Sequence, residues 1–262
     1  MPSPPKIAIA GASGFVGRAL AESLSREAFV IGLSRNAPSR PGEGCKEWRK
    51  ADFLSLLEAE KALEGVETAF YLIHSMMPSA HLTQGRFQDF DLIAADNFAR
   101  SAKANGVKQI IYLGGLIPEN EELSAHLSSR LEVGEALAAY GTPVTTLRAG
   151  MVIGRDGSSF VMVRRLVERL PVMLCPHWTR VKTQPIALRD IVGLLRFCAG
   201  NEKTFGESYD VGGPDVLTYE EMMREIGEAI GRHPILFRSP FLRQSYHACG
   251  FLWSRERPRH FA

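Results

Sequence analysis

Three glycines spaced three residues apart are the first residues whose type and spacing point to chemistry. Gly11, Gly14 and Gly17 follow a short apolar run at residues 6–10 and precede a helical stretch. Such a turn leaves unpaired backbone N–H groups and the positive end of a helix dipole where a pyrophosphate can bind. Gly11 would form the turn, Gly14 would let the backbone approach the phosphates, and Gly17 would let helix and strand pack closely. The alternative is a strand-to-helix turn that holds no ligand.

A second candidate binding position follows the next apolar run, at residues 29–33. Ser34 and Arg35 stand there, at the expected end of a strand. An acidic residue near this point binds the ribose hydroxyls of NAD, whereas an arginine favours the 2′-phosphate of NADP. Arg35 therefore predicts NADP(H) in preference to NAD(H). The alternative is that Arg35 is an exposed loop residue.

Further candidates stand at the ends of later apolar runs, because ligands of parallel sheets bind outside the carboxyl ends of the strands. Asp52 is expected either to accept a hydrogen bond from an adenine amino group or to cap a helix. The predicted dinucleotide-binding residues at the glycine turn and the strand ends are Gly11, Ser13, Gly14, Phe15, Val16, Gly17, Arg35, Asp52, Phe53, Leu72, Ile73, Leu113 and Gly114.

The elements that must position these residues alternate strand and helix five times within the first 115 residues. This pattern predicts an α/β fold with a doubly wound parallel Rossmann sheet, helices on both faces and a small C-terminal substrate lobe. We assign residues 1–155 to an NADP-binding core. Residues 156–262 form a mixed region that combines the lobe with the closing strand and helix of the core, in one structural unit.

The amino-acid composition limits the classes of molecule that the chain is expected to bind. The 31 lysines and arginines nearly balance the 29 acidic residues, so the net charge of +2 gives no reason to expect nucleic acid as a partner. The four cysteines are far apart and lack the spacing of a zinc site, so we expect no metal. Neither a leader peptide nor a membrane-spanning run is evident, and we expect a cytoplasmic protein.

Together these residues resemble the short-chain dehydrogenase/reductase superfamily, specifically its atypical or extended, NmrA-like branch. The resemblance covers roughly residues 5–232 and rests on four later segments besides the glycine turn. These segments are residues 147–154 (LRAGMVIG), 184–191 (QPIALRDI), 209–214 (YDVGGP) and 217–222 (LTYEEM).

The catalytic residues of that superfamily are not all present. Active members use a tyrosine as general acid and base, a lysine four residues later, and a serine or threonine that orients the substrate carbonyl. The matching positions here hold His126 and Arg130, and residues 113–118 contain neither serine nor threonine. His126 could relay a proton near neutral pH, and Arg130 could hold the cofactor, although arginine cannot exchange a proton as lysine does. The alternatives are a helix-entry histidine and an exposed helix charge.

The resemblance also implies a substrate lobe, for which the candidate residues are His74, Met173, His177 and Trp178. A soft apolar lining with an imidazole suits an apolar or aromatic ligand; the alternative is that these residues are ordinary core. The basic, aromatic tail at residues 234–262 either contacts a membrane or partner or packs on its own domain, and we favour the second.

Three functions follow from these observations. The first is an NADP(H)-dependent oxidoreductase acting on a small apolar carbonyl or quinone-like substrate. The second is a non-catalytic dinucleotide-binding regulatory or assembly protein, favoured by the missing tyrosine and lysine. The third is epimerase or dehydratase chemistry on a nucleotide sugar, against which the missing tyrosine argues.

Overall fold

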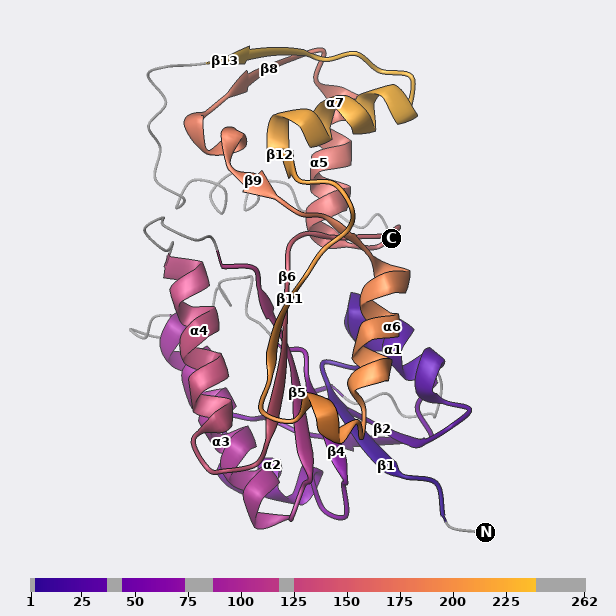
Figure 1. Cartoon of the computed structure of the whole chain (residues 1–262), viewed down its shortest axis with the longest axis vertical. Coiled ribbons are helices and arrows are strands. Elements are labelled where there is room, and N and C mark those ends of the chain that lie inside the picture. The colour runs from indigo at the N-terminus through magenta and orange to yellow at the C-terminus, as the bar shows by residue number, and fades with distance from the viewer. Residues whose placement is uncertain (1–2, 37–43, 74–86, 118–124, 239–262) are drawn as a thin grey trace, which may run out of the picture.

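A seven-stranded parallel sheet forms the centre of the molecule in the computed structural model, which describes residues 3–36, 44–73, 87–117 and 125–238 (Figure 1). The strand order is β11-β6-β5-β4-β1-β2-β3, and every neighbouring pair is parallel. The strands are β1 (Lys6–Ala10), β2 (Phe29–Ser34), β3 (Glu47–Lys50), β4 (Thr68–Tyr71), β5 (Gln109–Gly115), β6 (Val144–Ala149) and β11 (Ser208–Val211). The predicted fold class is confirmed.

Helices cover both faces of this sheet (Figure 1). One face carries α2 (Leu56–Ala62), α3 (Phe87–Ala104) and α4 (Ala125–Ala138), and the other carries α1 (Phe15–Leu24) and α6 (Leu188–Cys198). Strands β1, β4 and most of β2 are buried because a parallel sheet must have both faces covered. Their apolar runs therefore lack the polar alternation of a half-exposed strand.

A smaller lobe lies beyond the carboxyl edge of the sheet (Figure 1). It contains α5 (Ser158–Arg169), η1 (His177–Arg180) and α7 (Tyr219–Ala229), and the strand pairs β8 (Val172–Cys175) with β13 (Ile235–Arg238) and β9 (Lys182–Thr183) with β12 (Leu217–Thr218). Its own core joins α5, β8 and α7 through Val163, Val167, Met173, Met222 and Ile226. The predicted boundary at residue 155 stays a prediction.

The lobe connects to the sheet through closely packed backbone segments. β7 (Val152–Ile153) pairs with β10 (Ile186–Ala187). Within the sheet layer, η2 (Glu202–Thr204) leads from α6 into β11. The Gln184 side chain donates to the Gly213 carbonyl at 2.6 Å, and the Gly213 N–H donates to the Pro185 carbonyl at 2.8 Å. We call the crossing at Gly150, Gln184, Pro185 and Gly213 the neck. No helix in the part of the chain that the structure describes is long and apolar enough to cross a membrane.

Candidate dinucleotide site

The glycine positions at the turn after β1 leave little room for a Cβ. Gly11 adopts a φ of +90°, and a Cβ there would lie 3.2 Å from the Leu72 carbonyl oxygen. Gly14 closes the turn, since its N–H donates to the Gly11 carbonyl at 2.9 Å. A Cβ on Gly17 would lie 2.2 Å from that same carbonyl oxygen, so only glycine lets α1 pack against the turn.

Helix α1 begins immediately after this turn with its first N–H groups uncapped. Its N-cap is Gly14, which offers no side-chain acceptor, and its first turn contains no acidic residue. Ser13 and Gly14 are exposed. Uncapped N–H groups at the positive end of a helix dipole attract an anion, and the glycine turn lets a phosphate approach the backbone. The turn therefore fits a dinucleotide pyrophosphate.

Backbone pairing brings the candidate strand ends to one edge. The Gly11 N–H donates to the Leu33 carbonyl at 3.3 Å, and the Leu72 N–H donates to the Ala10 carbonyl at 3.0 Å. β4 and β5 continue the same alignment, because Tyr71 is paired with Tyr112. The structure thus gathers the glycine turn, Leu72 and Leu113 along the carboxyl edge.

Arg35 follows β2 at this edge. It is exposed and forms no ion pair with any residue in the described ranges. Ser34, the last residue of β2, accepts a hydrogen bond through its hydroxyl from the Asn36 N–H at 3.3 Å. Arg35 therefore lies two residues after Leu33, whose carbonyl accepts from Gly11 of the turn, and no carboxylate of the described residues forms an ion pair with it.

Asp52 and Phe53 have local structural partners. The Asp52 carboxylate accepts from the Leu54 N–H at 3.1 Å, and the Asp52 N–H donates to Glu58 at 2.9 Å. The N-cap of α2 is Ser55, so the expectation that Asp52 caps the helix is wrong, because the chain makes a further turn before α2 begins. The Phe53 ring is buried and lies 5.3 Å from that of Phe98. The adenine contact of Asp52 stays a prediction.

Arg130 reaches the carboxyl edge from helix α4. Its Nη1 donates to the Leu113 carbonyl oxygen at 3.3 Å, and its Nε is buried with no hydrogen-bond partner among the residues that the structure describes. The Tyr112 hydroxyl, from the strand that ends at this edge, donates to the backbone carbonyl of Arg130 at 3.1 Å. Arg130 is thus a fixed positive charge at the end of β5, consistent with holding a ligand there.

The remaining predicted catalytic and lobe residues divide into three groups. His126 belongs to α4, but its side chain lies outside the described residues, as does His74 entirely. Met173 is buried in the core of the lobe, and the Trp178 ring meets the Tyr219 ring edge to face at 5.6 Å. His177 is exposed. Their roles in binding a substrate stay predictions.

Two glycines outside the predicted site residues, Gly154 and Gly157, lie close to the first residue of α1. A Cβ on Gly154 would lie 2.6 Å from the Phe15 ring, and one on Gly157 would lie 3.1 Å from it. Phe15 is the first residue of α1, so these glycines let the segment after β7 pack against the start of the helix. Their spacing of three, directly after an apolar pair, was the available signal.

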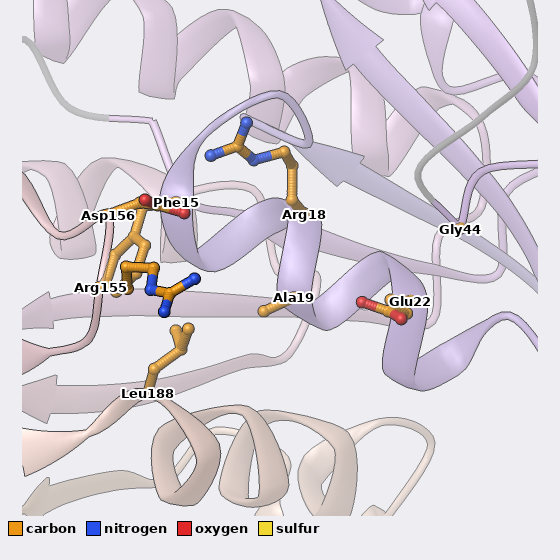
Figure 2. A pocket seen from close by; sticks show the side chains of 8 residues that line it. All are labelled: Phe15, Arg18, Ala19, Glu22, Gly44, Arg155, Asp156 and Leu188. Carbon is orange, nitrogen blue, oxygen red and sulfur yellow. The ribbon is translucent and has the colours of Figure 1, made fainter.

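A cavity of about 550 Å³ lies along the flank of α1 (Figure 2). Phe15, Arg155, Asp156 and Leu188 gather at the start of the helix, and Gly44 lies beyond Glu22. Arg18 and Ala19 complete the lining, in which two guanidinium groups accompany two carboxylates. Only Phe15 belongs to the predicted dinucleotide residues, so this cavity borders the candidate site without containing it.

Comparison with known families adds a sequence-wide observation. Residues 7–177, more than half of the chain, match the model of the NAD dependent epimerase/dehydratase family. The chain belongs to this family. The resemblance to extended short-chain dehydrogenases is confirmed at this level.

Other members of the epimerase/dehydratase fold are similar in structure. A nucleoside-diphosphate-sugar epimerase from Staphylococcus aureus superposes with a TM-score of 0.72 at 18% identity, covering 89% of this chain and 80% of the other. MoeE5, solved in complex with UDP-glucuronic acid and NAD, has a TM-score of 0.71 at 19% identity over 89% of this chain and 85% of that one. At these identities the likeness shows the fold alone.

Two curated relatives are similar in sequence. The auxiliary protein GraX of Staphylococcus aureus is 32% identical over 143 residues, which are 54% of this chain and 43% of GraX. Subunit 9 of the NADH dehydrogenase (ubiquinone) 1 alpha subcomplex, a mitochondrial protein of Arabidopsis thaliana, is 22% identical over 88% of this chain and 59% of the subunit. The chain therefore spans about half the length of the curated relatives it matches.

Proposed function

We propose that this family member binds NADP(H) at the carboxyl edge of its sheet. The observation that carries the proposal is the glycine turn that opens an uncapped α1, together with an exposed Arg35 at the end of the neighbouring strand that forms no ion pair within the described residues. A nicotinamide dinucleotide is also the ligand in the family's name and in the MoeE5 complex. Three cysteines are buried and form no disulfide within the described ranges, which supports the proposal of a cytoplasmic location.

Each part of the edge has a separate task in this proposal. The N–H groups that open α1 bind the pyrophosphate, Arg35 binds the 2′-phosphate, and Arg130 holds the end of the dinucleotide that lies over β5. Once bound, the dinucleotide supplies or accepts a hydride.

The cofactor choice is tested by titrating the purified chain with NADPH and NADH. Arg35→Ala should weaken NADPH binding about tenfold or more, because a charge-assisted hydrogen bond is lost, and should leave NADH nearly unchanged. Arg26→Ala, an exposed arginine beyond the far end of α1, is the matched control. Equal losses for both dinucleotides would show that Arg35 does not read the 2′-phosphate.

We further propose that the chain is an oxidoreductase for a small apolar carbonyl or quinone-like substrate, with His126 as the proton donor. Histidine titrates near neutral pH, which suits it to this role in place of tyrosine. NADPH oxidation should be measured with aldehydes, ketones and quinones, and with UDP-glucose because solved neighbours bind UDP-sugars. His126→Ala should abolish turnover and keep cofactor affinity.

The second candidate is a non-catalytic dinucleotide-binding regulatory or assembly protein. It is favoured by His126 and Arg130 at the positions of the tyrosine and lysine, and by curated relatives described as an auxiliary protein and a subunit of a larger complex. In that case NADPH binds, and none of the aldehydes, ketones, quinones or UDP-glucose causes its oxidation. Turnover that depends on His126 would exclude this candidate.

A further inference from the structure

Two hydrogen bonds join strand β5 and helix α4 at the proposed site, one donated by a side chain of each element. The Tyr112 side chain, from the strand, donates to the Arg130 backbone carbonyl at 3.1 Å. The Arg130 side chain, from the helix, donates to the backbone carbonyl of Leu113 at 3.3 Å, one residue after Tyr112. Each element therefore fixes the other through one side chain.

The bond from Tyr112 is additional to those that form the helix. Within an α-helix the carbonyl of residue 130 accepts from the N–H of residue 134. The Tyr112 hydroxyl adds a second donor to that carbonyl, and its ring lies where a Cβ on Gly134 would be 3.6 Å away. The tyrosine hydroxyl thus bonds to one turn of α4, and its ring lies within van der Waals reach of a side chain at position 134 in the next turn.

The Tyr112 hydroxyl itself is not suited to proton transfer. The side chain is buried, and burial raises the pKa of the phenol, although the Arg130 charge and a side-chain hydrogen bond with Arg130 lower it. A phenol whose pKa is raised and whose proton is engaged by a backbone carbonyl is a poor proton donor to a substrate. Tyr112 therefore does not replace the missing catalytic tyrosine.

We infer that Tyr112 is a positioning residue that sets the distance and rotation of α4, and so holds the Arg130 guanidinium at the carboxyl edge. This inference rests on the proposed role of Arg130 in dinucleotide binding. The contact through Leu113 is long for a charge-assisted bond, so the guanidinium depends on α4 for its position.

The test is a double-mutant cycle in the full chain. Tyr112→Phe keeps the ring and removes only the hydroxyl, and it should weaken NADPH binding about fivefold, as the loss of one hydrogen bond does. Arg130→Ala should weaken it about tenfold or more, and Tyr112→Phe added to Arg130→Ala should cause no further loss. Additive losses would overturn the inference.

Tyr140→Phe is the matched control, because the Tyr140 hydroxyl also ties the α4 region to another element. It donates to Asp96 of α3 at 2.7 Å, beyond the end of α4 that is far from Arg130. This variant should leave NADPH affinity unchanged. A loss equal to that of Tyr112→Phe would mean that both hydroxyls act through general stability.

A measurement without ligand separates this inference from the proposed function. The Nε of Arg130 is buried, so its N–H resonance should be visible by NMR in the ligand-free chain. Tyr112→Phe should shift that resonance and speed its exchange with water, whereas Tyr140→Phe should not. An unchanged resonance would overturn the inference even if NADPH binds, and a chain that binds no dinucleotide would refute only the proposed function.

Discussion

Gly17 and Gly193 both lie inside helices, but a side chain would meet very different surroundings at the two positions. A Cβ on Gly17 would lie 2.2 Å from the Gly11 carbonyl oxygen, which belongs to rigid backbone. A Cβ on the exposed Gly193 would meet nothing within 4 Å. Position 17 therefore requires glycine because α1 approaches the turn so closely.

Gly17→Ala should destabilise the chain by about 1–3 kcal/mol through overpacking and should abolish dinucleotide binding, since α1 must move away from the turn. Gly193→Ala should stabilise the chain by roughly 0.5–1 kcal/mol, because alanine favours the helix. Thermal unfolding of both variants measures the difference. A Gly17→Ala chain as stable as the original would refute the packing argument.

Helix α7 shows at element scale how a local sequence signal stabilises the lobe. Thr218 and Glu221 form a capping box, in which the Glu221 N–H donates to the Thr218 hydroxyl at 3.2 Å and the Thr218 N–H donates to Glu221 at 2.7 Å. The helix that follows carries Met222, Met223 and Ile226 into the core of the lobe. A defined start therefore fixes which face of α7 is buried.

Thr218→Ala should cost about 1 kcal/mol, the usual loss for an N-cap. The hydrogen bonds from the Thr218 backbone and side chain lower the pKa of Glu221, so the box stabilises the fold above the usual carboxyl pKa and loses this effect as the pH falls. The gap in melting temperature between the original and Thr218→Ala should therefore narrow in acid. Thr218→Ser, which retains the cap, should show little loss at any pH.

At the scale of the whole molecule, the neck joins the lobe to the sheet with no spare volume. A Cβ on Gly150 would lie 2.6 Å from the Gln184 carbonyl oxygen, and one on Gly213 would lie 2.4 Å from that of Pro185. Nearby, Arg148 of β6 bonds to Asp210 of β11 at 2.7 Å. The lobe is thus held over the carboxyl edge by backbone packing.

Gly213→Ala should push the neck segments apart, lower stability by about 1–3 kcal/mol, and speed amide hydrogen exchange in β11 and β12 together. Asp215→Ala, an exposed substitution two residues later, should change neither property. Exchange that rises only at residue 213 would mean that the neck does not hold the lobe.

Local sequence patterns predicted the fold class, which the structure confirms, and the tight turn at the glycines. Continuous apolar runs indicate strands buried on both faces, and glycines at 11, 14 and 17 indicate a tight turn into a helix, because both depend on local chemistry. Helix α1 begins at Phe15, directly after the turn that ends at Gly14.

Contacts between side chains of different elements could not be predicted from these patterns. Tyr112 and Arg130 are 18 residues apart, and no periodicity in the sequence links a buried strand residue to a helix carbonyl. The same holds for Phe15 with Gly154, and for Asp52, whose neighbour Ser55 caps α2 in its place. Contacts between elements depend on how helices pack across the sheet, and that packing is a property of the whole chain.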